Sequence, residues 1–158
     1  MLCKIVSGGQ TGVDRGALDA ALEAGFPCGG WCPEGRRAED GPISDRYPVV
    51  ELTGAGYLQR TLRNVADSDG TLIVFFGELS GGTLETVRFC ERLGKPHLLA
   101  DCGSTDIDTL AASAAAFVRA KAIAVLNVAG PRESSRPGAG EHARRIVRSL
   151  LASRSQLE

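Results

Sequence analysis

The chain has 158 residues, which is enough for one domain with a sizeable buried core. Hydrophobic residues make up 43% of it and charged residues 23%, the ordinary balance of a globular protein. The formal net charge of -1 excludes a strongly basic chain, so we expect no binding to nucleic acid or to a membrane surface. We therefore expect residues 1–158 to form a single domain.

Signals for export or membrane insertion are not visible in the sequence. No apolar run approaches the roughly 20 residues needed to span a bilayer, and the N-terminus lacks the charged and apolar regions of a secretory signal. The five cysteines show no disulfide framework, and Cys28 and Cys32 are followed by no second pair at a zinc-site interval. We expect a cytoplasmic protein with free thiols and no bound metal.

Segments typical of strands alternate with segments typical of helices. In chain order the pattern predicts a strand at residues 3–7, a helix at 12–24, an irregular loop at 29–48, a strand at 49–52, a helix at 56–66, a strand at 71–76, a helix at 83–93, a strand at 96–100, a helix at 106–120, a strand at 122–128 and a helix at 140–152. This alternation predicts an α/β fold with a doubly wound parallel sheet and helices on both faces.

Two local predictions concern the first helix and the long loop. Thr11 with Asp14 three residues later resembles a capping box at the start of the first helix. In the loop, Trp31 is expected to pack against the domain. The charged residues of that loop are expected to form a solvated face: Glu34, Arg36, Arg37, Glu39 and Asp40.

Three glycine-rich turns lie where a predicted strand is followed by a predicted helix. The first turn is Ser-Gly-Gly-Gln-Thr-Gly at 7–12, the second is Ser-Gly-Gly-Thr at 80–83, and the third is Asn-Val-Ala-Gly-Pro-Arg-Glu-Ser at 127–134. A helix N-terminus has unpaired N–H groups and partial positive charge, and glycine lets an anion approach them. Because the carboxyl ends of parallel strands meet at one edge, we expect the turns to form one pocket for a phosphorylated small molecule.

The residues expected to bind this ligand come from all three turns: Gly8, Gly9, Gln10, Thr11, Gly12, Gly81, Gly82, Thr83, Asn127, Gly130, Pro131, Arg132 and Glu133. Each turn also has a simpler interpretation. The first fits a tight strand-to-helix turn, and the second fits a capped helix start. In the third, Arg132 is placed either to clamp a phosphate or to pair with Glu133 or Asp101 at the surface. No catalytic residue is assigned, because neither a nucleophile with a histidine nor a pair of carboxylates is evident.

These segments resemble the molybdenum cofactor carrier family. The resemblance is carried by residues 8–21, 29–43, 60–65, 67–73, 80–83 and 126–134, and the run Gly-Gly-Trp-Cys-Pro-Glu-Gly-Arg-Arg-Ala-Glu-Asp-Gly-Pro-Ile at 29–43 is its most specific part. It covers most of the chain up to Pro137. The resemblance implies a Rossmann-like homo-oligomer that binds the molybdenum cofactor (molybdopterin) or a related phosphorylated ligand, with a molybdoenzyme as acceptor.

The family lies in a wider group that includes the lysine-decarboxylase-like phosphoribohydrolases, so a hydrolase of nucleotides or sugar phosphates is the alternative. Those enzymes carry the loop P-G-G-x-G-T-x-x-E, whose glutamate takes part in cleaving an N-glycosidic bond. Here Thr86 lies three residues after Thr83, and Glu85 comes one position early, about 100° away on a helix. A non-catalytic binding protein is therefore favoured, while Glu133 and Asp69 remain the carboxylates available to a hydrolase.

Overall fold

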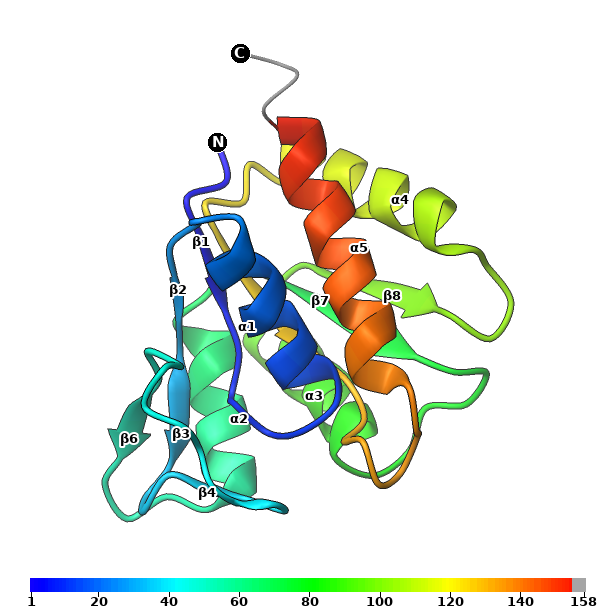
Figure 1. The fold of residues 1–158 in the computed structure, drawn as a ribbon. Helices are drawn as coiled ribbons and strands as arrows, with labels where there is room; N and C mark the ends of the chain where they lie inside the picture. Colours follow the sequence, from blue (N-terminus) through cyan, green and yellow to red (C-terminus); the bar gives the residue numbers. More distant parts are fainter. Residues whose placement is uncertain (155–158) are drawn as a thin grey trace.

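Five strands form a wholly parallel sheet at the centre of the protein, in the computed structural model that describes residues 1–154 (Figure 1). Their order across the sheet is β2-β1-β9-β7-β8. The strands are β1 (Lys4–Val6), β2 (Cys28–Gly29), β7 (Gly70–Phe75), β8 (His97–Asp101) and β9 (Val125–Ala129). The predicted Rossmann-like parallel sheet in one α/β domain is confirmed.

Helices cover both faces of this sheet, as the alternating pattern predicts. One layer consists of α1 (Val13–Glu23), α4 (Ile107–Ala120) and α5 (Ala139–Arg154), and the other of α2 (Tyr57–Ala66) and α3 (Gly81–Leu93). In β7, Leu72 and Val74 belong to the core under the first layer, whereas Ile73 belongs to the core under the second. Because neighbouring residues of β7 face opposite layers, the strand is apolar throughout.

The long segment between β2 and α2 is only partly irregular, so the loop predicted at 29–48 is wrong in part. It contains β3 (Trp31–Pro33), which pairs in parallel with β6 (Val50–Leu52), and a hairpin of β4 (Arg37–Ala38) and β5 (Gly41–Pro42). Arg36 donates hydrogen bonds to four carbonyl oxygens of this segment, including those of Ile43 and Val49 at 3.0 and 2.7 Å. Arg36 therefore ties the segment together rather than joining a solvated face.

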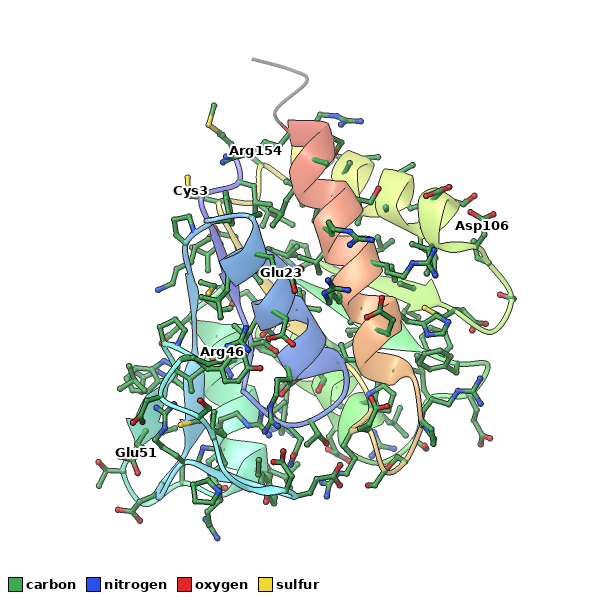
Figure 2. The ribbon with its side chains drawn as sticks, viewed as in Figure 1. Cys3, Glu23, Arg46, Glu51, Asp106 and Arg154 are labelled. Carbon is green, nitrogen blue, oxygen red and sulfur yellow. The ribbon has the colours of Figure 1, made fainter. Side chains whose placement is uncertain are left out.

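Charged side chains are concentrated on the outer surface, where Glu23, Glu51 and Asp106 lie (Figure 2). Glu23 on α1 accepts a hydrogen bond of 2.9 Å from Arg144 on the neighbouring α5. Asp106 caps α4, accepting a bond of 2.8 Å from the backbone N–H of Thr109. The first contact joins the C-terminal end of α1 to α5, and the second caps α4.

The capping box predicted at the start of α1 is wrong. The helix begins after Gly12 with no side-chain cap. The Thr11 hydroxyl instead accepts a hydrogen bond from the backbone N–H of Glu133 at 3.2 Å and donates to Glu39. The Asp14 carboxylate accepts a bond of 3.3 Å from the N–H of Gln10, the residue before Thr11, and not from the N–H of Thr11. Long-range partners thus hold the first turn where a local cap was expected.

Candidate functional site

A cleft of about 430 Å³ lies where β1, β9 and β7 end, which are adjacent strands of the sheet. The helix that follows β1 covers one face of the sheet, and the helix that follows β7 covers the other. The helices that follow β1 and β7 therefore leave the sheet toward opposite faces, which makes this a topological switch point. In open α/β sheets ligands bind at such a point, beyond the carboxyl ends of the strands. The volume falls in the range of small-molecule sites, from about 300 to 1,000 Å³.

The structure brings all three glycine turns to this cleft. Of the residues predicted from the sequence, those that line it are Gly8, Gln10, Gly81, Gly82, Thr83, Asn127, Gly130, Pro131 and Arg132. The others, Gly9, Thr11, Gly12 and Glu133, do not line it. Thr11, Gly12 and Glu133 instead border a second, more open hollow between α1 and α5.

The second turn presents the N-terminus of α3 to the cleft. Ser80 occupies the N-cap position, but its side chain makes no capping hydrogen bond. A Cβ atom added at Gly81 or Gly82 would meet no heavy atom within 4 Å, so the space before both residues is open. Because the first N–H groups of a helix have no partner within the helix, this end of α3 offers an anion several donors and a positive dipole end.

The first turn is filled by the protein itself. A Cβ atom added at Gly8 would lie 1.5 Å from the Arg60 guanidinium, and one at Gly9 would lie 2.9 Å from the Ile43 side chain. At Gly12 a Cβ atom would lie 2.4 Å from the carbonyl oxygen of Pro131. Glycine is needed at these positions for packing, which matches the simpler interpretation of this turn.

A buried ion pair underlies the first turn and lines the cleft. Arg60 on α2 donates a hydrogen bond of 2.9 Å to Asp14 on α1, and the two side chains are 8% and 10% exposed. Burial raises the pKa of the Asp14 carboxyl above its ordinary value, while the positive charge of Arg60 opposes that rise. Sequence reasoning missed this pair, because no local pattern connects residues that lie 46 positions apart.

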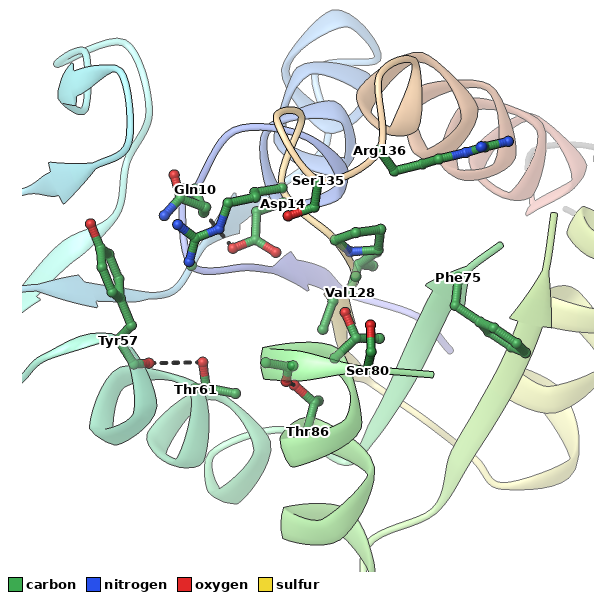
Figure 3. Close-up of a pocket in the computed structure, with 18 of the residues that line it drawn as sticks. Gln10, Asp14, Tyr57, Thr61, Phe75, Ser80, Thr86, Val128, Ser135 and Arg136 are labelled. Carbon is green, nitrogen blue, oxygen red and sulfur yellow. Dashed lines mark hydrogen bonds between the residues drawn. The ribbon is translucent and has the colours of Figure 1, made fainter. Parts of the chain in front are cut away.

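Two buried donors in the same place have no hydrogen-bond partner among the described residues. They are Nε2 of Gln10 and Nε of Arg60, and each residue is only 7% exposed. Figure 3 shows Gln10 and Asp14 across the cleft from Ser80 and Thr86 of α3. A buried donor without a partner costs free energy, so these two atoms call for acceptors that the described residues do not provide.

Aromatic rings and arginines complete the cleft wall. Tyr57 is 37% exposed, and the guanidinium of Arg132 lies 5.6 Å from its ring centre. Arg132 also approaches the Glu39 carboxylate at 3.9 Å, so its ion pair is with Glu39 and not with Glu133 or Asp101. Hydrogen bonds from Ser134 and Thr11 keep the pKa of Glu39 below its ordinary value, so Glu39 fastens the loop to the third turn.

The comparisons with known proteins agree with the fold. The model of the circularly permutated YpsA SLOG family matches residues 5–151. The chain belongs to this family. A protein from Syntrophus aciditrophicus SB, known from a crystal structure as "putative molybdenum carrier protein", shares 41% sequence identity with a TM-score of 0.92, over 95% of each chain. No curated protein sequence matches the chain. The predicted resemblance to molybdenum carriers is thereby confirmed.

The carboxylates considered for a hydrolase lie away from the cleft of this SLOG-family chain. Glu133 accepts hydrogen bonds from the N–H groups of Gly138 and Gly140 at 2.6 and 3.0 Å, at the start of α5. Asp69 bonds to the N–H group of Val125 at 2.8 Å, at the opposite end of the sheet. Glu85 pairs with Arg88 at 2.6 Å. The carboxylates that line the cleft, within residues 1–154, are Asp14 and Glu78.

In residues 1–154, no cluster of at least three histidine, cysteine or acidic side chains is arranged to hold a metal ion. None of the helices in that range is both long and apolar enough to pass through a membrane.

Proposed function

We propose that this protein binds the molybdenum cofactor, or a closely related phosphorylated ligand, in the cleft and carries it unchanged. The observation that carries the proposal is the pairing of an open helix N-terminus with unpartnered buried donors in one cleft. Gly81 and Gly82 leave the end of α3 open, and Gln10 and Arg60 supply the donors. Together they favour a ligand with one anionic end and further acceptor atoms.

The molybdenum cofactor has this chemistry, since molybdopterin has a single terminal phosphate ester attached to a heterocyclic body. In the proposal the phosphate is held by the backbone N–H groups of Gly81, Gly82 and Thr83, which begin α3 and line the cleft. Arg132 adds a positive charge at the rim, because its side chain is 42% exposed and only loosely paired with Glu39. The name of the structural neighbour supports this choice of ligand.

Binding without reaction is favoured over hydrolysis by the state of the carboxylates. Asp14 is held by Arg60, and Glu133, Asp69 and Glu85 have their own partners outside the cleft. A hydrolase needs a carboxylate free to act as a base or to stabilise positive charge near the scissile bond. Within the described residues, the other carboxylate that lines the cleft is the exposed Glu78, so hydrolysis would depend on this one residue.

Replacing Gly82 by valine tests the proposal, because a Cβ atom at this position meets no heavy atom within 4 Å and the side chain is directed into the open space before α3. We expect Gly82→Val to weaken cofactor binding by about 2 kcal/mol, roughly thirtyfold. The protein is incubated with the molybdenum cofactor and passed through gel filtration, and retained cofactor is measured by the fluorescence of the oxidised pterin. Thermal melting shows whether the variant is folded.

Ala112→Val is the matched control, because Ala112 is exposed on α4 in the helix layer away from α3. It introduces the same side chain into a helix and is expected to retain as much cofactor as the wild type. If the wild type retains none, or if folded Gly82→Val protein retains as much as the wild type, the carrier assignment is wrong.

A further inference from the structure

We infer that Gln10 and Arg60 form a second recognition point that reads acceptor atoms on the edge of a planar heterocycle, such as a lactam carbonyl beside a ring nitrogen. The observations are two buried donors without partners, in the same cleft as the open end of α3. The inference rests on the proposed function, because it takes the phosphate of the ligand to lie at α3. It narrows the ligand to phosphate esters of oxo-substituted heterocycles.

Hydrogen bonds fix the orientation of the Gln10 amide. Its oxygen accepts from the backbone N–H groups of Thr11 and Glu39 at 3.0 and 2.9 Å. Because the oxygen is already used twice, the amide nitrogen is directed to the position where no protein acceptor lies. Gln10 therefore presents a donor and not an acceptor to the ligand.

Arg60 is fixed as well. Its Nη1 donates to Asp14 at 2.9 Å, and the absence of a Cβ atom at Gly8 leaves room for the guanidinium. The buried Nε of Arg60 has no partner and can only donate, since arginine has no acceptor. Asp14 balances the charge of Arg60, so this part of the cleft suits a neutral acceptor better than a second phosphate.

Tyr57 supplies a flat surface beside these donors. It lies on the cleft wall with Arg60 5.8 Å and Arg132 5.6 Å from its ring centre. Because both guanidinium groups lie over the Tyr57 ring, a planar heterocycle is expected to stack on a guanidinium plane or to contact the ring edge. One donor from each residue in the same cleft suits a ligand edge with two adjacent acceptors, such as O6 and N7 of an oxopurine.

The test compares ligands that carry an oxo or an amino group at this edge; the ring nitrogen on the other side of that group, N1 of the purine or N3 of the pterin, changes with it from N–H to acceptor. Inosine 5′-monophosphate presents O6 beside N7, whereas adenosine 5′-monophosphate presents an amino donor beside N7. Pterin-6-ylmethyl phosphate and its 4-amino counterpart form a second matched pair. We expect the wild type to bind the oxo member of a pair about tenfold tighter than the amino member, measured by titration calorimetry.

Gln10→Glu is the decisive variant, because it keeps an acceptor for Thr11 and Glu39 and replaces the free donor by an oxygen. The oxo preference is expected to disappear or reverse. The ratio between the two members of a pair is the readout, because the added charge acts on both alike. Gln10→Leu removes the donor without adding charge, and it is expected to abolish the preference if Gln10→Glu does not fold.

Ribose 5-phosphate separates failure of this inference from failure of the proposed function, because it carries the phosphate without a ring. If it binds to the wild type and not to Gly82→Val, while oxo and amino ligands bind equally, then the inference is wrong and the phosphate site stands. An unchanged oxo preference in folded Gln10 variants also overturns the inference. If none of these phosphate compounds binds, the inference and the phosphate site on which it rests are both wrong.

Discussion

The first and second glycine turns have the same sequence signature and different physical reasons for it. In the first turn, added Cβ atoms would collide with Arg60, with Ile43 and with the backbone of the third turn. In the second turn, added Cβ atoms at Gly81 and Gly82 would meet nothing within 4 Å. Glycine is required by the protein's own packing in the first turn. In the second turn the φ of 53° favours glycine at Gly81, whereas at Gly82 the absence of a side chain keeps the helix end accessible.

The difference shows how a functional glycine is separated from a structural one. Some glycines are required neither by neighbouring atoms nor by their φ angle, and they still cost backbone entropy on folding. The presence of such a glycine suggests that a bound molecule needs the space. Gly82 is of this kind, because it lies in α3 with a conformation that other residues adopt. Gly12 is the opposite case, with a φ of 80° and three backbone atoms crowded against it.

The largest effect on stability is expected for Gly12→Ala. The new Cβ atom would lie 2.4 Å from the carbonyl oxygen of Pro131, in a left-handed backbone conformation. Strain and overpacking together are expected to lower the free energy of unfolding by about 4 kcal/mol, measured by urea denaturation. Gly25→Ala is the control, since Gly25 has a φ of 62° with open space around it, and it is expected to cost only about 1 kcal/mol. Equal losses in both variants would contradict the packing role of Gly12.

Next in size is Arg60→Met, which leaves Asp14 buried without its cation. The free energy of unfolding is expected to fall by about 3 kcal/mol near neutral pH. Replacing both residues, as Asp14→Leu with Arg60→Met, is expected to leave it within about 1 kcal/mol of the wild type.

The loss in Arg60→Met is expected to depend on pH. Burial raises the pKa of Asp14 and Arg60 lowers it, so without Arg60 the folded state binds a proton more readily. A raised carboxyl pKa gives stability that is present in acid and lost as the pH rises, so the destabilisation shrinks on acidification. Urea denaturation across the acidic range checks this, and a loss independent of pH would show that Asp14 is not the cause.

The smallest effect is expected for Gly82→Ala, with the opposite sign to Gly12→Ala. Alanine at a helical position with open space around it is expected to raise the free energy of unfolding by about 0.5 kcal/mol. Cofactor retention is expected to fall in the same variant, though less than in Gly82→Val. A destabilised Gly82→Ala protein would mean that both turns use glycine for packing.

Most of the fold follows from the sequence because its signals are local. The apolar run of β7 and the amphipathic pattern of α1 depend on neighbouring residues only, and both are recovered within one or two positions. The strand predicted at 122–128 starts late, at Val125, because the N–H group of Ile123 closes α4 by bonding to Val118. An apolar residue that ends a helix cannot be told from the start of a strand by its hydrophobicity.

Some features of the site also follow from the sequence, and others depend on tertiary contacts. That the three turns meet at one edge follows from the parallel sheet, which is a property of topology. Which turn is open does not follow from it, because Ile43 and Arg60 reach the first turn from distant parts of the chain. The roles of Arg36, Glu39 and the Asp14–Arg60 pair also depend on tertiary contacts that no local spacing predicts.

A crystal structure of the protein grown with inorganic phosphate tests the contrast between the turns most directly. We expect one phosphate ion bound by the backbone N–H groups of Gly81, Gly82 and Thr83, at donor–acceptor distances of about 2.7 to 3.2 Å. We expect no ion at the N–H groups of residues 9–12, because Ile43 and Pro131 crowd that turn. A phosphate held by residues 9–12, or a cleft that stays empty at a saturating phosphate concentration, would contradict the assignment of the second turn as the anion site.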